Sequence, residues 1–147
     1  PRGWLEAIRP FLAVYISPGE SPLPLGEVDC IEICRRYPPI LRLDTTTNQV
    51  LVGSRHVDDL GLGHFAILQH LSEHAGKVCD RKVLYRVYQK ASYPDYYEKD
   101  LKASDIASVL DTALYRLRAS IEPIPANPVL LETVRGRGVR LRSPARD

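Results

Sequence analysis

Residues 104–142 constrain the fold of this chain more than any other stretch. Apolar residues recur there at intervals of three and four positions, which places them on one face of a helix and predicts a buried stripe. These residues are Ile106, Leu110, Leu114, Leu117 and Ile121. Ser104 is a good N-cap for this helix, and Pro123 and Pro125 end it. We therefore expect one long helix that packs against a core.

A β-hairpin with a basic tip is expected after this helix. Asn127-Pro128 is a turn signal, residues 129–134 are apolar and β-branched, and residues 139–142 read as a return strand. The turn between them is Arg-Gly-Arg-Gly, in which the glycines can take positive φ. Residues 135–146 contain five arginines and no acid. A helix followed by such a hairpin suits a DNA duplex, because the helix fits the major groove and the arginines reach phosphates or a narrow minor groove. A buried helix with an ordinary exposed hairpin is the alternative interpretation.

Composition places the chain among globular proteins. Its 147 residues suffice for one domain, or one domain plus an extension. The net charge is only +2, and residues 1–102 carry equal numbers of acids and bases, so the positive excess lies in the last third. Three cysteines leave one unpaired in any disulfide framework, so we expect reduced thiols and a cytoplasmic protein. No apolar run approaches the roughly 20 residues that span a bilayer, so we expect no membrane partner.

The beginning of the chain is expected to lie outside the main domain. The chain starts at Pro1 and contains no methionine, which suggests a fragment of a longer protein. Residues 1–26 are predicted to be an N-terminal extension, or the end of a preceding domain plus a linker, because residues 17–26 are rich in proline and glycine. Residues 27–147 are predicted to form the functional domain.

Four short strands and two helices are expected between residues 28 and 92. Residues 28–36 alternate loosely, as a strand would, and residues 40–44, 49–52 and 55–57 are separated by polar turns. The first helix is expected to begin within residues 60–65 with weak capping and two unfavourable glycines, and to end at Ala75-Gly76. Asp80 is expected to cap the second helix.

Several short motifs in this chain match those of one family. Residues 110–118 (LDTALYRLR) resemble a VDVHIxRLR recognition helix, and residues 126–141 contain ANP and TVRGRGVRL, which resemble the pattern NPxxIxTVRGxGYRL. Residues 41–52 resemble LxLDxxxxxVxxxG, and residues 76–81 (GKVCDR) resemble GRVVSR. These are motifs of OmpR/PhoB-type output domains of response regulators. The resemblance covers about residues 39–142.

The resemblance implies an α+β fold, a winged helix-turn-helix with an N-terminal antiparallel β-sheet, a three-helix bundle and a C-terminal β-hairpin wing. It implies a regulator of transcription in a two-component system that binds double-stranded promoter DNA, with the recognition helix in the major groove and the wing in the minor groove. It also implies RNA polymerase and a head-to-tail dimer on DNA as optional partners, and an upstream sensory or receiver domain. The residues expected to contact DNA are Arg81, Ser108, Thr112, Tyr115, Arg116, Arg118, Thr133, Arg135, Arg137 and Arg140.

The recognition helix is less basic than the family pattern. Ser108 and Tyr115 stand where the family often has arginine, Ala113 stands in place of a histidine, and Val139 replaces the tyrosine of the wing. This departure supports a second hypothesis, in which the winged helix is a protein-interaction module with little DNA binding.

The loop over residues 93–102 is longer than the loop of the family and rich in tyrosine. Tyr93, Tyr96 and Tyr97 either contact a partner protein or pack on the body of the domain as part of a short extra helical turn. We expect the second arrangement more than the first.

Two pairs of side chains in the sequence suggest metal sites, although we expect neither a metal nor an enzymatic activity. His70 and His74 fall in an HxxEH motif, in which histidines at i and i+4 share zinc, but no third ligand is evident downstream. Cys30 and Cys34 lie roughly 13 Å apart if they are on a strand, whereas on a helix they could share a metal with His56. A helix with an apolar core face explains the histidines, and buried free cysteines are common. No cofactor-binding motif is found.

Overall fold

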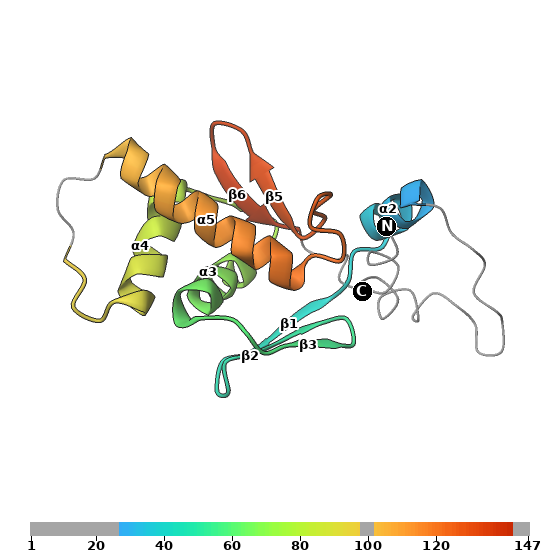
Figure 1. Cartoon of the computed structure of the whole chain (residues 1–147), viewed down its shortest axis with the longest axis horizontal. Coiled ribbons are helices and arrows are strands. Elements are labelled where there is room, and N and C mark those ends of the chain that lie inside the picture. The colour runs from blue at the N-terminus through green and yellow to red at the C-terminus, as the bar shows by residue number, and fades with distance from the viewer. Residues whose placement is uncertain (1–26, 98–101, 143–147) are drawn as a thin grey trace.

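The computed structural model describes residues 27–97 and 102–142, and Figure 1 shows its helices and strands. The predicted α+β winged helix-turn-helix is confirmed: two three-stranded antiparallel sheets, ordered β1-β2-β3 and β4-β6-β5, flank the helices α3, α4 and α5. The elements are α2 (Glu27–Arg36), β1 (Leu41–Asp44), β2 (Gln49–Val52), β3 (Arg55–Val57), α3 (Leu62–Glu73), β4 (Val78–Cys79), α4 (Arg81–Ser92), α5 (Ala103–Ile121), β5 (Leu131–Val134) and β6 (Gly138–Leu141).

The strand that we predicted over residues 28–36 is wrong, because this segment is helix α2. In a strand every second residue lies on the same side, so Cys30 and Cys34 would share a side with Glu32. In the helix the two cysteines instead lie together on a buried face. Glu32 and Arg36 are exposed and form an ion pair at i, i+4, with Nη2 and Oε1 3.6 Å apart. The N-terminal sheet therefore has three strands, and a helix precedes it.

The N-terminal sheet packs on the end of α5. Val50, Val52 and Val57 are buried, and the polar turn between β1 and β2 faces solvent. Arg55 of β3 donates a hydrogen bond of 2.6 Å from Nη2 to the carbonyl oxygen of Ser120, in the last turn of α5. This bond joins two elements that are far apart in the sequence, and it fixes the position of α5 relative to the sheet.

Helices α3, α4 and α5 surround the core and contribute to it five leucines with no exposed surface. Lack of space explains why α3 contains Gly63, although glycine weakens a helix. A Cβ atom at this position would lie 2.2 Å from Ser92 Oγ and 2.7 Å from the ring of Tyr88. The glycine therefore permits the close approach of α3 and α4. The N-cap Gly61 has no side-chain capping bond, as expected, and Asp80 caps α4 by accepting a bond of 2.8 Å from Lys82 N. The leucines of these three helices that have no exposed surface are Leu68, Leu71, Leu84, Leu110 and Leu117.

The hairpin of β5 and β6 (residues 131–141) is named the wing below, and it gains a third strand that the sequence did not indicate. The short strand β4 pairs with β6, so that Cys79 lies opposite Val139. Gly138 has φ of 151°, and a Cβ atom there would lie 2.0 Å from the carbonyl oxygen of Cys79. Gly136 at the tip has φ of 76° with no atom near its Cβ position. Only glycine fits position 138, because β4 and β6 approach so closely there.

Over the described residues, no helix has both the length and the apolar composition that crossing a membrane requires.

Candidate nucleic-acid interface

Helix α5 buries one face and exposes the other, as the sequence predicted. All five apolar residues of the predicted stripe are buried, together with Ala113. The predicted N-cap is wrong: the helix begins at Ala103 with Lys102 as N-cap, and no side chain caps it. Ser104 lies inside the first turn and is exposed. Because the start of α5 does not depend on a capping side chain, tertiary packing of the apolar face accounts for the position of the helix.

The outer face of α5 carries the side chains that we expected to meet DNA bases. Ser108, Thr112 and Arg116 are exposed, and Tyr115 exposes 75% of its surface. Thr112 Oγ1 donates a bond of 2.9 Å to the carbonyl oxygen of Ser108, so its hydroxyl group is engaged with the backbone of the helix. An exposed tyrosine presents both an apolar ring and a hydroxyl group. This face is thus polar and uncharged except for Arg116 and the neighbouring Asp111.

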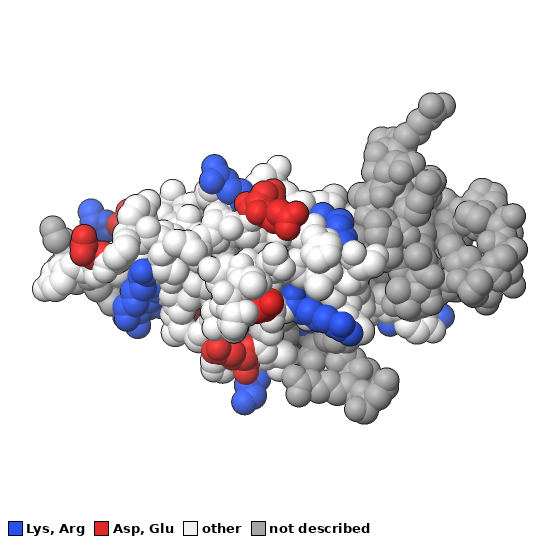
Figure 2. Space-filling view, turned by 90° about the horizontal axis from the view of Figure 1, so that it is seen from below, with Lys and Arg blue, Asp and Glu red and all other residues white. Residues whose placement is uncertain are grey.

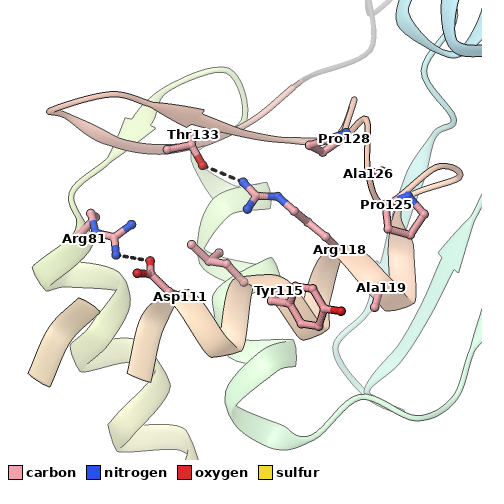
Figure 3. A pocket seen from close by; sticks show the side chains of 10 residues that line it. Arg81, Asp111, Tyr115, Arg118, Ala119, Pro125, Ala126, Pro128 and Thr133 are labelled. Atoms are coloured by element: carbon pink, nitrogen blue, oxygen red, sulfur yellow. Dashed lines mark hydrogen bonds and ion pairs between the residues drawn. The ribbon is translucent and has the colours of Figure 1, made fainter. Parts of the chain in front are cut away.

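Arg118 joins α5 to the wing. Its Nη2 donates to Thr133 Oγ1 at 2.8 Å and to the carbonyl oxygen of Leu131 at 3.2 Å, and its Nε lies 3.4 Å from the same carbonyl oxygen. The side chain is half-buried, so these bonds form partly away from water. Arg118 therefore positions strand β5 against the helix, in addition to carrying charge at the interface (Figure 3).

Arg81 is the first residue of α4, and it pairs with Asp111 of α5. Arg81 Nη2 and Asp111 Oδ1 lie 2.5 Å apart, with one-third of the arginine side chain exposed. The pair ties the two helices of the helix-turn-helix together at the surface. It also compensates part of the charge that we expected Arg81 to offer to a phosphate.

A groove of about 680 Å³ runs between α5, the wing and residues 125–128. Figure 3 shows the ion pair Arg81–Asp111 and the hydrogen bond Arg118–Thr133 among the residues that line it. The rest of its lining is largely apolar and comes from α5 and the following loop. The lining residues there are Leu114, Tyr115, Ala119, Pro125, Ala126 and Pro128.

The arginines of the wing fall into two groups. Arg135 and Arg137 lie in the turn at the tip and are exposed. Arg140 lies opposite Glu132 in the β5–β6 ladder and is bonded to it, with Nη2 2.5 Å and Nε 3.1 Å from Glu132 Oε2. The tip arginines are therefore directed to solvent, whereas the charge of Arg140 is compensated within the sheet. An adjoining groove, lined by Arg118, Thr133 and Arg135 among others, connects the tip with α5.

Glu122 is a structural residue of this interface that the sequence analysis missed. It is buried, and its two carboxylate oxygens accept backbone N–H bonds of 2.8 to 3.1 Å from Val129, Leu130 and Leu131. Burial raises the pKa of Glu122, and the three backbone bonds and Arg118 oppose that shift. The carboxylate fixes the loop that leads from α5 into the wing. A glutamate directly before Pro123 at a helix end is a weak signal, because the partners lie in a different segment.

In the tyrosine-rich loop, part of the side chains pack on the domain and part are exposed, so each of the two expected arrangements holds for some of the tyrosines. Tyr93 and Tyr97 expose 60% and 79% of their surfaces, whereas the ring of Tyr96 meets Tyr85 of α4 edge-on, with centroids 6.5 Å apart. One tyrosine therefore packs on the body and two are directed to solvent. Residues 98–101 lie outside the described residues, so the extra helical turn is not tested over that part.

Charge is dispersed on the face that Figure 2 shows. Basic and acidic side chains alternate over it, and neither sign gathers into a continuous patch among the residues coloured there. This face therefore offers no continuous positive surface to a nucleic acid.

The comparisons with known proteins agree with this geometry. The family model described as "Transcriptional regulatory protein, C terminal" matches residues 59–141. The chain is 36% identical over 104 residues to the sensory transduction protein RegX3 of Mycobacterium leprae, which covers 70% of this chain and 46% of RegX3. It is 33% identical over 78 residues to the transcriptional regulatory protein AfsQ1 of Streptomyces coelicolor, covering 53% of this chain and 30% of AfsQ1. The chain thus spans less than half the length of these two relatives.

Solved structures show the same fold. The DNA-binding domain of Klebsiella pneumoniae RstA, solved in complex with the RstA box, matches with a TM-score of 0.51 and 27% identity over 69% of this chain and 90% of that one. The DNA-binding domain of CpxR from E. coli matches with a TM-score of 0.53 and 24% identity over 71% and 92% of the two chains, a likeness of fold alone. With its helix-turn-helix, its wing and the match over most of the described residues, the chain belongs to the family of C-terminal domains of transcriptional regulatory proteins of the OmpR/PhoB type.

Proposed function

We propose that this domain binds double-stranded DNA in a sequence-specific manner and thereby regulates transcription. The observation that carries the proposal is the arrangement of two exposed polar surfaces around connected grooves: the outer face of α5 and the tip of the wing. An α-helix fits the major groove of B-DNA, and an adjacent hairpin reaches the neighbouring backbone or minor groove. The similar domain of RstA was solved with its DNA box, which supports the same use here.

The outer face of α5 supplies the base contacts in this proposal. Arg116 is exposed and can donate two hydrogen bonds to guanine, and the methyl group of Thr112 and the ring of Tyr115 suit thymine methyl groups. Ser108 lies one turn before Thr112 and accepts or donates a hydrogen bond through its hydroxyl group. Because only one of these residues is charged, base recognition by apolar and neutral polar contacts is expected to dominate on this helix.

Arg81 and Arg118 supply phosphate contacts at the rim of the groove. Each is already bonded within the protein, but a guanidinium has five N–H donors and these partners use only some of them. A phosphate oxygen in the groove therefore accepts hydrogen bonds from the remaining N–H donors. The protein partners hold the guanidinium planes in place before DNA binds. The hydroxyl group of Thr133 accepts from Arg118 and keeps its own proton to donate to a phosphate.

The wing supplies Arg135 and Arg137 to the minor groove, where negative potential is enhanced when the groove is narrow. Both side chains are exposed at the tip. Arg140 contributes less in this proposal than the sequence suggested, because Glu132 compensates its charge.

Salt dependence of binding tests the proposal. Affinity for a random-sequence duplex is measured by fluorescence anisotropy over a range of salt concentrations, for the wild type and for Arg135→Ala/Arg137→Ala. The control, Arg35→Ala/Arg42→Ala, removes the same charge from exposed positions outside the grooves. We expect log affinity to fall linearly with log salt. The slope of the wing variant should be smaller in magnitude by about 1.8, the difference expected for two lost phosphate contacts. No binding by the wild type at low salt would contradict the proposal.

A protein-interaction module is the second candidate function. It is favoured by the pairing of Arg81 with Asp111 and of Arg140 with Glu132, which leaves fewer uncompensated cations at the grooves than the sequence suggested. Under this alternative the wild type and both variants fail to bind DNA, while the domain co-purifies with a partner. Tyr93 and Tyr97, exposed at the opposite end of α4 from the wing, would then be the first residues to replace.

The wider setting is also a proposal. The relatives are sensory and transcriptional regulatory proteins of which this chain covers less than half, and this supports an upstream receiver or sensory domain in the full protein. Head-to-tail dimerisation on direct repeats, contact with RNA polymerase and a cytoplasmic location follow from the same role. A duplex with one or two half-sites, analysed by sedimentation, distinguishes a monomer from a dimer on DNA.

A further inference from the structure

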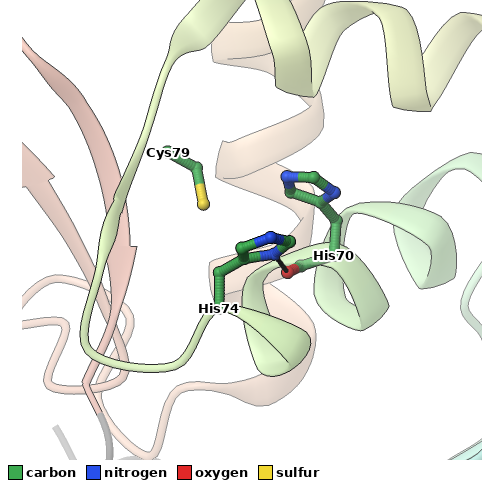
Figure 4. A group of neighbouring side chains, drawn as sticks. All are labelled: His70, His74 and Cys79. Atoms are coloured by element: carbon green, nitrogen blue, oxygen red, sulfur yellow. Dashed lines mark hydrogen bonds between the residues drawn. The ribbon is translucent and has the colours of Figure 1, made fainter.

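Three side chains with metal-binding atoms meet between the end of α3 and strand β4. His70 lies in the last turn of α3, His74 is the C-cap residue of that helix, and Cys79 is the last residue of β4. Their nitrogen and sulfur ligand atoms all lie within 4.8 Å of one another. Figure 4 shows the thiol of Cys79 directed toward the two imidazole rings.

The third ligand, Cys79, was not evident in the sequence, because a turn of the backbone after α3 places it beside the two histidines. The chain turns after α3 at Gly76, which has φ of 81° and whose N–H donates to the carbonyl oxygen of Leu141 at 2.9 Å. Lys77 N donates to the carbonyl oxygen of His74 at 2.9 Å, which closes the turn. β4 is then held by its pairing with β6. Cys79 is therefore placed beside the histidines by backbone interactions that no ligand is needed to form.

The hydrogen bonding of His74 selects the tautomer that a metal requires. His74 Nδ1 lies 2.8 Å from the carbonyl oxygen of His70. A carbonyl oxygen only accepts, so Nδ1 carries the proton and donates it, and in the neutral ring Nε2 keeps its lone pair. This is the usual arrangement of a metal-binding histidine, whose second nitrogen is hydrogen-bonded to a fixed acceptor.

The other two ligands are partly or wholly removed from water. His70 is half-buried. Cys79 is buried, and its thiol makes a long contact of 3.9 Å with the carbonyl oxygen of Lys77. A metal ion would displace the thiol proton to solvent as it forms its bond to sulfur.

We propose that His70, His74 and Cys79 bind a Zn²⁺ ion, with a water molecule in the fourth position. Two imidazole nitrogens and one thiolate suit zinc, whereas Mg²⁺ and Ca²⁺ take oxygen ligands. Zinc bonds of about 2.0–2.1 Å to nitrogen and about 2.3 Å to sulfur place these tetrahedral ligand atoms roughly 3.3–3.6 Å apart. Side-chain rotation closes the remaining gap, because His74 is exposed and His70 is half-exposed. The exposed side of His74 leaves room for the water molecule.

The position of this site gives the ion a structural role. Cys79 precedes Asp80, the N-cap of α4, and lies opposite Val139 of the wing. An ion there joins the end of α3 to the point where α4 begins and the wing attaches. We do not extend the proposal to hydrolysis, because the family is one of transcriptional regulatory domains.

Cobalt spectroscopy tests the site independently of DNA binding. The reduced, metal-free domain is titrated with Co²⁺, and Zn²⁺ is then added as a competitor. We expect a thiolate-to-cobalt charge-transfer band in the near ultraviolet, tetrahedral bands in the visible region, saturation at one ion per chain, and loss of all bands when Zn²⁺ displaces Co²⁺. The absence of the charge-transfer band in the wild type would overturn the proposal.

Two ligand variants and a control complete the test. Cys79→Ser is expected to lose the charge-transfer band, and His70→Gln to weaken binding by more than about tenfold, the loss that even a supporting residue causes. His56→Gln removes an exposed histidine of β3 and is expected to bind as the wild type does. Circular dichroism of each metal-free variant verifies folding. Unchanged cobalt binding in folded Cys79→Ser and His70→Gln, or equal loss in His56→Gln, would contradict this assignment.

Discussion

Arg118 Nη2 donates a hydrogen bond of 2.8 Å to Thr133 Oγ1, so a residue of the DNA-facing helix and a residue of the wing support each other. The same guanidinium contacts the carbonyl oxygen of Leu131. The two surfaces that we propose to meet DNA are therefore held in one relative position by a side chain that itself lies at the interface.

We expect Arg118→Ala to lower both stability and DNA affinity. The bonds from the half-buried guanidinium to β5 are worth about 1–2 kcal/mol of unfolding free energy, and loss of a positioned arginine is worth about 1–3 kcal/mol of binding. Urea unfolding and anisotropy measure the two effects. Thr133→Val, which removes the hydroxyl partner but keeps the charge, is the comparison for stability alone, because Thr133 has its own proposed phosphate contact. If Arg118→Ala left the unfolding free energy unchanged, the contact with the wing would have no supporting role.

Arg135→Ala is predicted to separate binding from stability. Because the side chain is exposed at the tip of the wing, its removal should cost on the order of 1–3 kcal/mol in DNA binding and leave thermal unfolding almost unchanged. Arg42→Ala, at an exposed position of β1, is the charge-matched control. Equal affinity losses in the two variants at matched salt would argue for a general charge effect and against a contact by the wing.

The two glycines of the wing should respond differently to alanine. At position 138, a Cβ atom would lie 2.0 Å from the backbone oxygen of Cys79, so Gly138→Ala must separate β4 from β6. We expect a loss of more than about 3 kcal/mol, at the upper end of single substitutions. Gly136→Ala meets no neighbouring atom and carries only the strain of its positive φ, about 1–2 kcal/mol. Chemical denaturation of both variants checks this order, and equal losses would refute the close-approach explanation.

The pH dependence of stability should carry a contribution from Glu122. Because burial raises the pKa of Glu122, the folded state binds its proton more tightly than the unfolded state does. The resulting stabilisation is fully present below the ordinary glutamate pKa, and it is lost as the pH rises through the raised pKa of the folded state.

Glu122→Gln removes this titration while keeping a side chain of similar size. The unfolding free energy of the wild type minus that of the variant should therefore decrease as the pH rises from acid toward neutral, measured by urea unfolding at each pH. The contributions of the other carboxyl groups cancel in this difference of unfolding free energies. The free-energy cost of the amide in the variant does not depend on pH, so it shifts the difference by a constant. A difference that increases with pH would mean that the three backbone bonds, and not burial, determine the pKa of Glu122.

Features that depend on local periodicity were predictable from the sequence. The buried stripe of α5, the wing with its glycine turn and the N-terminal strands β1 to β3 each follow from spacing within about twenty residues. The prediction of a strand over residues 28–36 was wrong for a related reason. A short segment of mixed polarity fits both the two-residue period of a strand and the 3.6-residue period of a helix, and contacts with the rest of the fold select the helix.

The features that could not be predicted are pairings between distant segments. Nothing near Arg81 indicates that Asp111 will compensate its charge, and a two-residue strand such as β4 has no pattern of its own. The same applies to Glu122, whose partners lie beyond the next turn, and to Cys79, which joins the two histidines only after the chain turns back. The sequence therefore identified the residues of the interface better than it identified which of them are already engaged within the protein.

Amide chemical-shift mapping tests the central claim most directly. A ¹⁵N-labelled domain is titrated with a short duplex at low salt, and each backbone amide is followed. The account predicts that the largest changes cluster at Thr112, Tyr115, Arg116 and Arg135, with little change in β1 to β3. Changes confined to residues 93–97, or no change at a concentration of DNA far above that of the protein, would contradict a DNA interface formed by α5 and the wing.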